Sequence, residues 1–228
     1  MYFAMRFALA ILAALLLAPG ARGEIVVIDY EDLVEGALGD PLTHQGVTYR
    51  DLNTVSGVFP DGSTFDPQPD DQFIAEDATV FYNDFPSYGS PVHALTFGLA
   101  FVPGGNLTIG PLATVTMDLP QPAVSASLDL AYYENGVWGG IVYHLDAYDQ
   151  GQLVASDSFV IADVEPRDNP AVATLQVSGA PFTELRLYAT YEDSYSMPRG
   201  MIDDLTLDFV GPVPTENVSW GRVKRTWR

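Results

Sequence analysis

Four acidic residues near the two ends of the main part of the chain have the chemistry of a calcium site. Glu31 and Asp203 are the principal candidates, with Asp29 or Asp32 as a further ligand. Alternation along the last apolar segment puts Asp203 on one face with Met201, Leu205, Leu207 and Phe209. A carboxylate on such a face must be paired, hydrogen-bonded or metal-bound, because burial of a bare charge is costly. Calcium accepts carboxylate and carbonyl oxygens, and a carboxylate that caps backbone amides at a strand end is an equally good interpretation.

The proposed ligands come together only if the first and last strands are neighbours. In a jelly-roll sandwich these strands commonly pair antiparallel, which would bring residues 29–32 beside residues 201–204. The chain contains no cysteine, so no disulfide can stabilise it. An ion that binds only the folded form would stabilise the fold by mass action. The sequence therefore predicts a structural calcium ion at this junction.

Aromatic residues gather in two segments that the predicted topology brings to one end of the fold. The candidates for ligand binding are Tyr133, Asn135, Trp138, Tyr191 and Tyr195. Flat rings beside carboxylates and amides suit a sugar, because a ring stacks on its apolar face while polar groups bond its hydroxyls. Ordinary packing is the better interpretation of Tyr132 and Tyr188. Trp138 stands in a glycine-flanked segment with less scaffold to bury it, so we expect it at a ligand surface.

The chain contains none of the short motifs that mark common hydrolases. G-x-S-x-G and H-E-x-x-H are absent, and there is no cysteine nucleophile. The three histidines are far apart in sequence, and a packed or surface role is the better interpretation of His144. Glycosidases need two well-placed carboxylates, but the 30 acidic residues offer no distinct pair. The sequence favours a binding protein over an enzyme.

The elements that must position these residues are almost all β-strands. Residues 124–132 and 141–147 alternate with a period of two, which is typical of strands with one buried face. Asp149-Gln150-Gly151 forms a hairpin turn, and Asp61–Asp77 is expected to be a long surface loop. Further strands are expected at 25–30, 47–50, 79–82, 95–101, 113–119, 153–160, 175–177, 185–189 and 201–209. Many short strands separated by turn residues predict an all-β fold, an antiparallel β-sandwich of jelly-roll type.

Residues 1–23 have the pattern of a secretory signal peptide. Arg6 supplies a positive charge, Phe7 to Ala18 form an apolar run too short to span a bilayer, and small residues follow. We expect cleavage after Ala21 or Gly23. The mature protein is then secreted or at the cell surface, of bacterial character, with no transmembrane segment.

The rest of the chain is strongly acidic. The net charge is −20 at pH 7, and only four arginines lie between Glu24 and Thr215. Such a surface repels nucleic acid and anionic membranes. Simple solubility is the better explanation of the bulk charge, with cation binding as the other.

The domain is expected to span residues 24–211, followed by a Pro-containing linker and a basic, tryptophan-containing tail at 212–228. The tail carries Arg222, Lys224, Arg225 and Arg228. It shows no alternation with which to join a sheet, so we expect Asn217 to Arg228 to be dispensable for folding. We interpret the tail as a signal for surface attachment or for sorting machinery.

Three short motifs resemble those of secreted bacterial jelly-roll domains: Ile28-Asp29-Tyr30-Glu31-Asp32-Leu33, residues 128–133, and Met201-Ile202-Asp203-Asp204-Leu205. Many such domains belong to exported proteins of the PEP-CTERM type and are similar in fold to galactose-binding-like and carbohydrate-binding modules. Val213-Pro214-Thr215-Glu216 resembles the start of a PEP-CTERM tail, although the hydrophobic helix of that tail is missing. Galactose-binding-like modules often carry an ion near the junction considered above, so the resemblance also implies calcium.

These patterns predict a secreted, non-catalytic β-sandwich that binds an extracellular or cell-surface glycan. The alternative from another class is a structural or surface-matrix protein that self-associates through its acidic surface with calcium. A glycan hydrolase or lyase is the weaker alternative.

Overall fold

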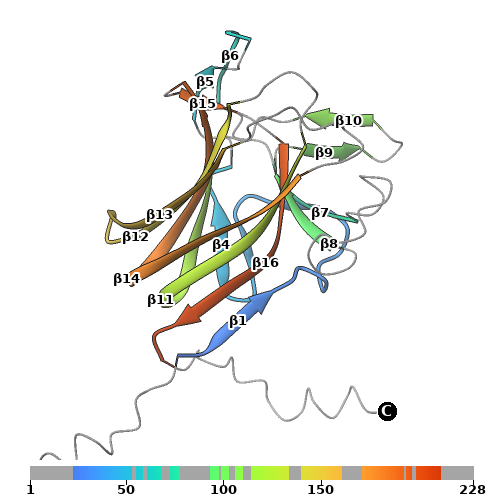
Figure 1. Cartoon of the computed structure of the whole chain (residues 1–228). Helices are drawn as coiled ribbons and strands as arrows, with labels where there is room; N and C mark the ends of the chain where they lie inside the picture. The colour runs from blue at the N-terminus through green and yellow to red at the C-terminus, as the bar shows by residue number, and fades with distance from the viewer. Residues whose placement is uncertain are drawn as a thin grey trace, which may run out of the picture.

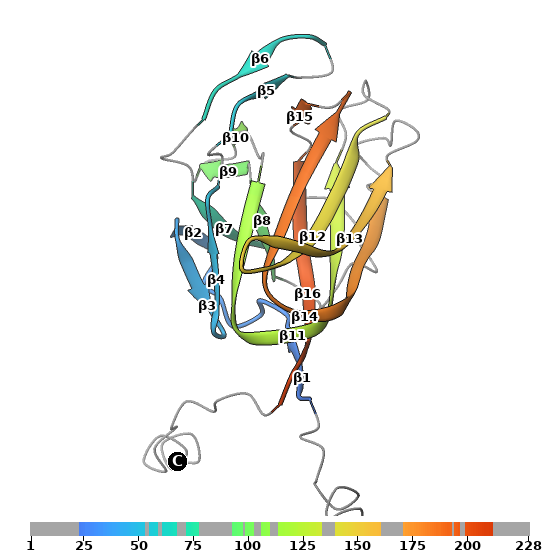
Figure 2. The same cartoon turned by 90° about the vertical axis from the view of Figure 1, so that its left-hand side faces the viewer.

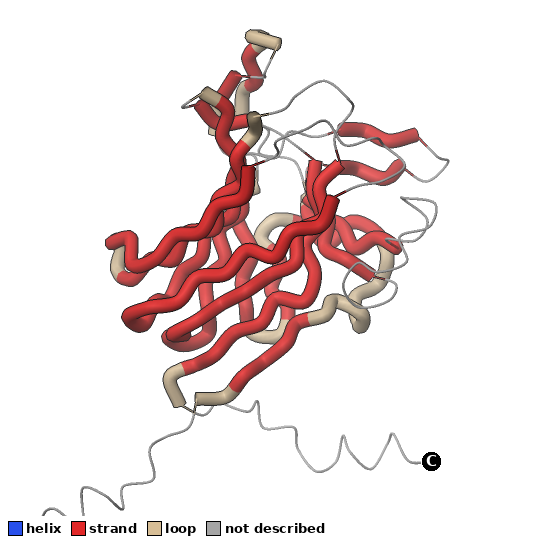
Figure 3. Tube along the Cα trace, viewed as in Figure 1, coloured by secondary structure: helices blue, strands red, loops and turns tan. Residues whose placement is uncertain are grey.

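The computed structural model describes residues 23–52, 55–58, 61–67, 72–77, 93–97, 99–102, 106–109, 114–133, 140–160, 171–192, 194–196 and 199–211. Within these ranges all regular structure is β-strand (Figure 3), and no helix in them could cross a membrane. The strands are β1 Ile25–Ile28, β2 Gly36–Gly39, β3 Leu42–His44, β4 Val47–Arg50, β5 Gly57–Val58, β6 Thr64–Phe65, β7 Phe73–Asp77, β8 His93–Phe97, β9 Leu99–Val102, β10 Asn106–Ile109, β11 Thr114–Tyr133, β12 Val142–Asp149, β13 Gln152–Val160, β14 Ala171–Tyr191, β15 Ser194–Ser196 and β16 Arg199–Phe209.

The main strands form two antiparallel layers (Figure 1). The first layer runs β3-β4-β11-β14-β12-β13 and uses the N-terminal part of β11 and the C-terminal part of β14. The second layer runs β14-β11-β16-β8-β7-β2 and uses the other parts of these two strands, with β1 added on β16. The protein is therefore an all-β, antiparallel β-sandwich of jelly-roll type, as the sequence predicts.

Strands β11 and β14 are long because each one passes from one layer to the other. Figure 2 shows both curving round the base of the sandwich. The pairing of β11 with β14 is interrupted between Asp118 and Ala123. Pro120 and Pro122 fall in this interruption, where a missing backbone N–H costs no regular ladder bond. The sequence predicts two separate strands on either side of this point, and the structure joins them into one bent strand.

The core lies between the layers and follows the predicted alternation. Val115, Met117 and Leu145 from the first layer, and Leu128 and Leu205 from the second, are fully buried. Burial of each such aliphatic side chain contributes about 1.5–3 kcal/mol. With no disulfide available, this burial is the main source of stability on the described part of the chain.

The first strand pairs antiparallel with the last, as predicted. The register runs from Ile25 opposite Asp208 to Ile28 opposite Leu205. The backbone N–H of Phe209 also donates to the carbonyl of Glu24 at 3.0 Å. The two described ends of the chain therefore lie side by side at one pole of the sandwich (Figure 1).

Of two predictions for the chain before residue 114, a loop at 61–77 and a strand at 79–82, the structure contradicts the first and does not describe the second. The stretch 61–77 is not one long loop, because it contains β6 and β7, and Phe73 in β7 is completely buried. The sequence pattern did not reveal β7, because its short apolar run Phe73-Ile74-Ala75 is flanked by acidic residues and prolines that are typical of loops. The strand expected at 79–82 lies outside the described residues. So do residues 1–22 and 212–228, and the signal peptide, the tail and the domain limits stay predictions.

Candidate functional site

The carboxylates of the predicted calcium site contact different partners. Glu31 Oε1 accepts a hydrogen bond from the backbone N–H of His93 at 2.9 Å. Asp32 Oδ1 lies 3.2 Å from His44 Nε2, without hydrogen-bond geometry, and Asp29 Oδ1 accepts from the backbone N–H of Glu31 at 3.3 Å. Among the described residues no three acidic, histidine or cysteine side chains are grouped so that they could hold a metal ion. A site made of Glu31 and Asp203 with backbone carbonyls stays a prediction.

Asp203 is completely buried, but the face predicted for it is wrong. Between Thr206 and Asp203, β16 has one residue more than β11 has between Ser127 and Asp129. This β-bulge includes Asp204, whose φ is 46°, and one extra residue inverts the alternation. Asp203 is consequently opposite Asp129, on the face away from Leu128. Its Oδ1 accepts the backbone N–H of Asp204 at 2.8 Å.

The predicted aromatic cluster is described only in part. Tyr191 is partly buried, packs against the core and lies beside Gly140. The register places Tyr195 opposite Thr190, and Tyr133 is the last residue of β11. Trp138 and Asn135 lie outside the described residues. Their role in ligand binding stays a prediction.

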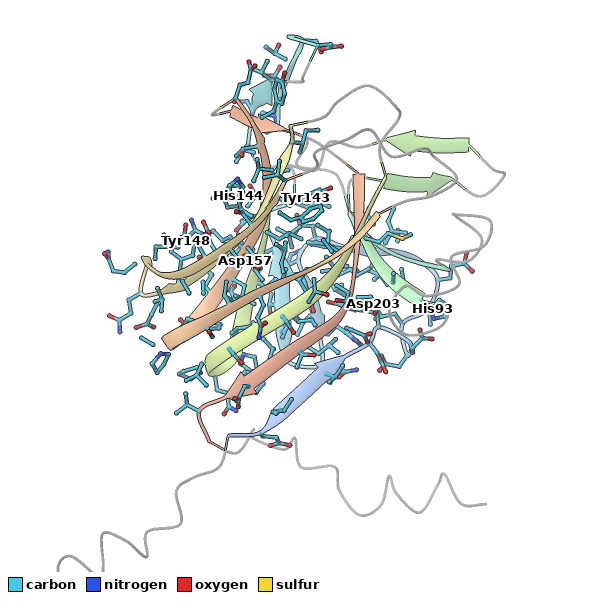
Figure 4. The ribbon with its side chains drawn as sticks, in the orientation of Figure 1. His93, Tyr143, His144, Tyr148, Asp157 and Asp203 are labelled. Atoms are coloured by element: carbon cyan, nitrogen blue, oxygen red, sulfur yellow. The ribbon has the colours of Figure 1, made fainter. Side chains whose placement is uncertain are left out.

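The outer face of the first layer carries a continuous set of polar and aromatic residues, which we call the polar face. The register aligns His144, Tyr188 and Thr114 in one row, Asp146, Arg186, Thr116 and Arg50 in the next, and Tyr148, Glu184 and Asp118 in a third. Alternate residues of the same strands, such as Leu145 and Leu187, point into the core. In Figure 4, His144 and Tyr148 lie on the side of the first layer, away from Asp203 and His93.

A pocket of about 300 Å³ opens on the polar face. It is lined by Asp51, Val55, Thr114, Thr116, Tyr148, Arg186 and Tyr188. The strands supply most of this lining, while Asp51 and Val55 come from the segment after β4. Its volume is at the lower end of the range for small-molecule sites, and its few polar groups converge on one space. The pocket is the candidate functional site.

A buried carboxylate holds the two pocket tyrosines. Asp146 is 4% exposed, and its Oδ2 accepts hydrogen bonds from the hydroxyls of Tyr188 at 2.9 Å and Tyr148 at 3.3 Å. The Ser156 hydroxyl donates to its Oδ1 at 2.5 Å. A buried carboxylate needs such donors, because its charge is otherwise expensive to desolvate. Asp146 thereby fixes the orientation of both rings.

His144 supports Tyr188 from the neighbouring strand. The two rings stack with centroids 4.7 Å apart and an interplanar angle of 13°, and His144 Nε2 lies 2.7 Å from Thr190 Oγ1. Burial lowers the pKa of His144, and the charge of Asp146 partly opposes this shift. The imidazole is therefore neutral at pH 7, which suits stacking on a phenol ring.

Two arginines form ion pairs along the polar face. Arg50 donates to both Asp118 oxygens, at 2.6 and 3.0 Å, and also contacts Asp51 and Glu184. The hydrogen bonds with Asp118 raise the pKa of Arg50 above its ordinary value, although burial acts in the opposite direction. Arg186 donates to Glu184 at 2.7 Å, and its guanidinium lies 4.3 Å from the centre of the Tyr148 ring. This cation–π contact holds Tyr148 from above.

The sequence analysis missed this site, and it assigned Tyr188 to ordinary packing although Tyr188 lines the pocket. One signal was present in the sequence. His144, Asp146 and Tyr148 alternate with apolar residues in one strand, as Glu184, Arg186 and Tyr188 do in another. Such alternation describes any half-exposed strand, so it does not distinguish a binding face from a solvated one.

No family model matches the sequence, and no curated protein matches it. Similar solved structures include the K1 cleaved adhesin domain of Lys-gingipain from Porphyromonas gingivalis, with 10% identity, 82% of this chain and 99% of that chain covered, and a TM-score of 0.42. CsCBM6-3 from Clostridium stercorarium, in complex with cellobiose, has 11% identity, coverage of 84% and 99%, and a TM-score of 0.27. Arthrobacter globiformis isomalto-dextranase, complexed with panose, has 12% identity, coverage of 83% and 33%, and a TM-score of 0.33. At these identities and TM-scores the function has to rest on the residues of this chain.

Proposed function

We propose that this protein is a secreted, non-catalytic module that binds an extracellular or cell-surface glycan in the pocket of the polar face. The observation that carries the proposal is the lining of that pocket. Tyr148 and Tyr188 offer rings, while Thr114 and Thr116 offer hydroxyls that both donate and accept hydrogen bonds. A sugar presents the same combination of apolar C–H faces and hydroxyl edges.

The rings are held in place before any ligand arrives. Tyr188 is fixed by Asp146 and by the stack on His144, and Tyr148 is fixed by Asp146 and by Arg186. Side chains that are already ordered lose little conformational entropy on binding, so more of the contact energy contributes to affinity. A rigid strand face is accordingly a suitable platform for a weakly bound, repetitive polymer.

The bonding of the two carboxylates that hold the pocket side chains, Asp146 and Glu184, supports binding rather than catalysis. Asp146 is nearly inaccessible and bonded to three hydroxyls, and Glu184 pairs with both arginines. Acid–base catalysis of glycoside cleavage needs carboxyl groups that can reach the glycosidic oxygen or a water. These two carboxylates serve the structure of the site instead.

A glycan array on the mature domain, followed by titration calorimetry, tests the proposal. Tyr148→Ala should weaken binding of the selected glycan by about 1–3 kcal/mol, the range for loss of an aromatic contact in a site. Leu153→Ala is the matched control, since Leu153 is 57% exposed on the edge strand β13 and does not line the pocket. Trp138→Ala tests the predicted contribution of the neighbouring segment. No binding to any glycan would overturn the proposal.

A further inference from the structure

Negative charges outnumber positive charges around the pocket. The carboxylates of Asp51, Asp118, Asp146 and Glu184 surround two guanidinium groups, those of Arg50 and Arg186. The whole chain carries a net charge of −20, so its overall charge adds to this excess. A ligand that enters the pocket meets a negative field from its immediate surroundings and from the rest of the domain.

Both guanidinium groups are already occupied by carboxylates of the chain. Arg50 is paired with Asp118 through two hydrogen bonds. Arg186 Nε and Nη2 both lie 2.7 Å from Glu184 Oε1. Glu184 thereby occupies the Nε–Nη2 edge of Arg186, and an anionic sugar could use this edge for a bidentate bond only by displacing Glu184. The displaced carboxylate would then lose its bonds to Arg186 and keep only its contact with Arg50, within a partly buried site.

We infer that the pocket selects uncharged glycans and excludes glycans that carry carboxylate or sulfate groups, an inference that rests on the proposed function. A neutral sugar is not repelled by the surrounding carboxylates, and its hydroxyls can still bond to hydroxyl groups of the pocket. Thr114 lines the pocket, and its Oγ1 is buried without a hydrogen-bond partner among the described residues. A ligand hydroxyl that reaches Thr114 Oγ1 would supply the missing hydrogen-bond partner.

Titration calorimetry with two sets of probes tests the selectivity of the wild-type domain. The neutral set contains cello-, xylo- and malto-oligosaccharides, and the acidic set contains oligogalacturonate and oligomannuronate of the same lengths. Binding of at least one neutral probe, with at least tenfold weaker binding of every acidic probe at low salt, supports the inference. Added salt should narrow the difference, because exposed charges more than a Debye length apart, about 8 Å at physiological ionic strength, are screened.

The variant Asp51→Asn tests the cause of the selectivity. Asp51 has a φ of 65°, a conformation that asparagine tolerates well, so the backbone can be retained. Loss of this negative charge should raise the affinity for acidic probes relative to neutral ones by about three- to tenfold. Glu35→Gln is the matched control, because it removes one negative charge from an exposed residue that does not line the pocket. Its ratio of affinities for acidic and neutral probes should equal that of the wild type.

The outcomes separate this inference from the function on which it rests. Acidic probes that bind as tightly as neutral ones, or an Asp51→Asn ratio equal to that of Glu35→Gln, would overturn the charge selectivity and leave glycan binding intact. If no probe of either set binds and the glycan array is also blank, the proposed function fails and the inference fails with it.

Discussion

The hydroxyl of Tyr188 donates a hydrogen bond to Oδ2 of Asp146 at 2.9 Å, between neighbouring strands of the first layer. The same oxygen accepts from Tyr148, the other tyrosine of the pocket. A single buried carboxylate thus orients both rings, although it does not itself line the pocket. Asp146 is a positioning residue, and its effect on a ligand is transmitted through the two phenol groups.

Substitution of Asp146 should reduce both stability and affinity. Asp146→Ala removes the acceptor of the hydroxyls of Tyr188, Tyr148 and Ser156, and a hydrogen bond to a charged group contributes about 1.5–3 kcal/mol. Asp146→Asn retains one acceptor oxygen and should cost less. Urea unfolding gives the stability, and calorimetry with the selected glycan gives the affinity. Equal affinity for wild type and both variants would show that ring orientation does not matter for binding.

The bulge in β16 predicts a specific pattern at Asp203 and Asp204. Asp203→Ala removes the acceptor of the Asp204 backbone N–H and should destabilise the domain by about 1–3 kcal/mol. Asp203→Asn retains an acceptor and should be milder. Asp204→Gly should be tolerated, since glycine adopts a φ of 46° readily. Chemical denaturation measures all three, and an Asp203→Ala variant as stable as the wild type would contradict this account.

The calcium prediction is tested by thermal unfolding with and without EDTA. If Glu31 and Asp203 hold an ion, EDTA should lower the transition temperature of the wild type and leave Asp203→Asn unaffected, because an ion that binds only the folded state stabilises it. The structure already supplies Glu31 with the His93 backbone N–H as a partner. A wild-type transition that is insensitive to EDTA would therefore assign Glu31 and Asp203 to hydrogen bonding alone.

Two histidines should make the domain less stable in mild acid. Burial lowers the pKa of His44 and of His144, opposed in part by Asp32 and Asp29 for His44 and by Asp146 for His144. The unfolded chain therefore takes up protons first as the pH falls, and the free energy of unfolding should decrease between about pH 7 and pH 5. His44→Gln and His144→Gln should each flatten this dependence in urea unfolding. Slopes identical to that of the wild type would rule out the histidines as its source.

Alternation along single strands predicts the fold class, because it reports which side of a strand is apolar. Val115 and Met117, or Leu128 and Leu130, are identifiable as core residues from sequence alone, and the structure buries them completely. The pairing of the first and last strands follows from the general topology of jelly rolls, and the register confirms it.

Features that depend on local backbone geometry or on long-range register could not be predicted in the same way. The single extra residue at Asp204 inverts the face of Asp203. Aspartate adopts a positive φ more readily than most residues, but an aspartate alone does not mark a bulge. The pocket requires Thr114 to stand opposite Tyr188, and Thr116 opposite Arg186, on two neighbouring strands. Sequence alternation gives the face of each strand but not the register between strands that are far apart in the chain.

Proton–nitrogen correlation NMR of the isotope-labelled mature domain, titrated with a neutral oligosaccharide selected on the array, tests the central claim most directly. The account predicts saturable shifts of the backbone amides of Thr116, Tyr148, Arg186 and Tyr188, with the opposite layer unaffected. Tyr148→Ala should abolish or strongly weaken these shifts. Saturable shifts confined to residues outside the polar face, or no shifts with any glycan, would contradict it.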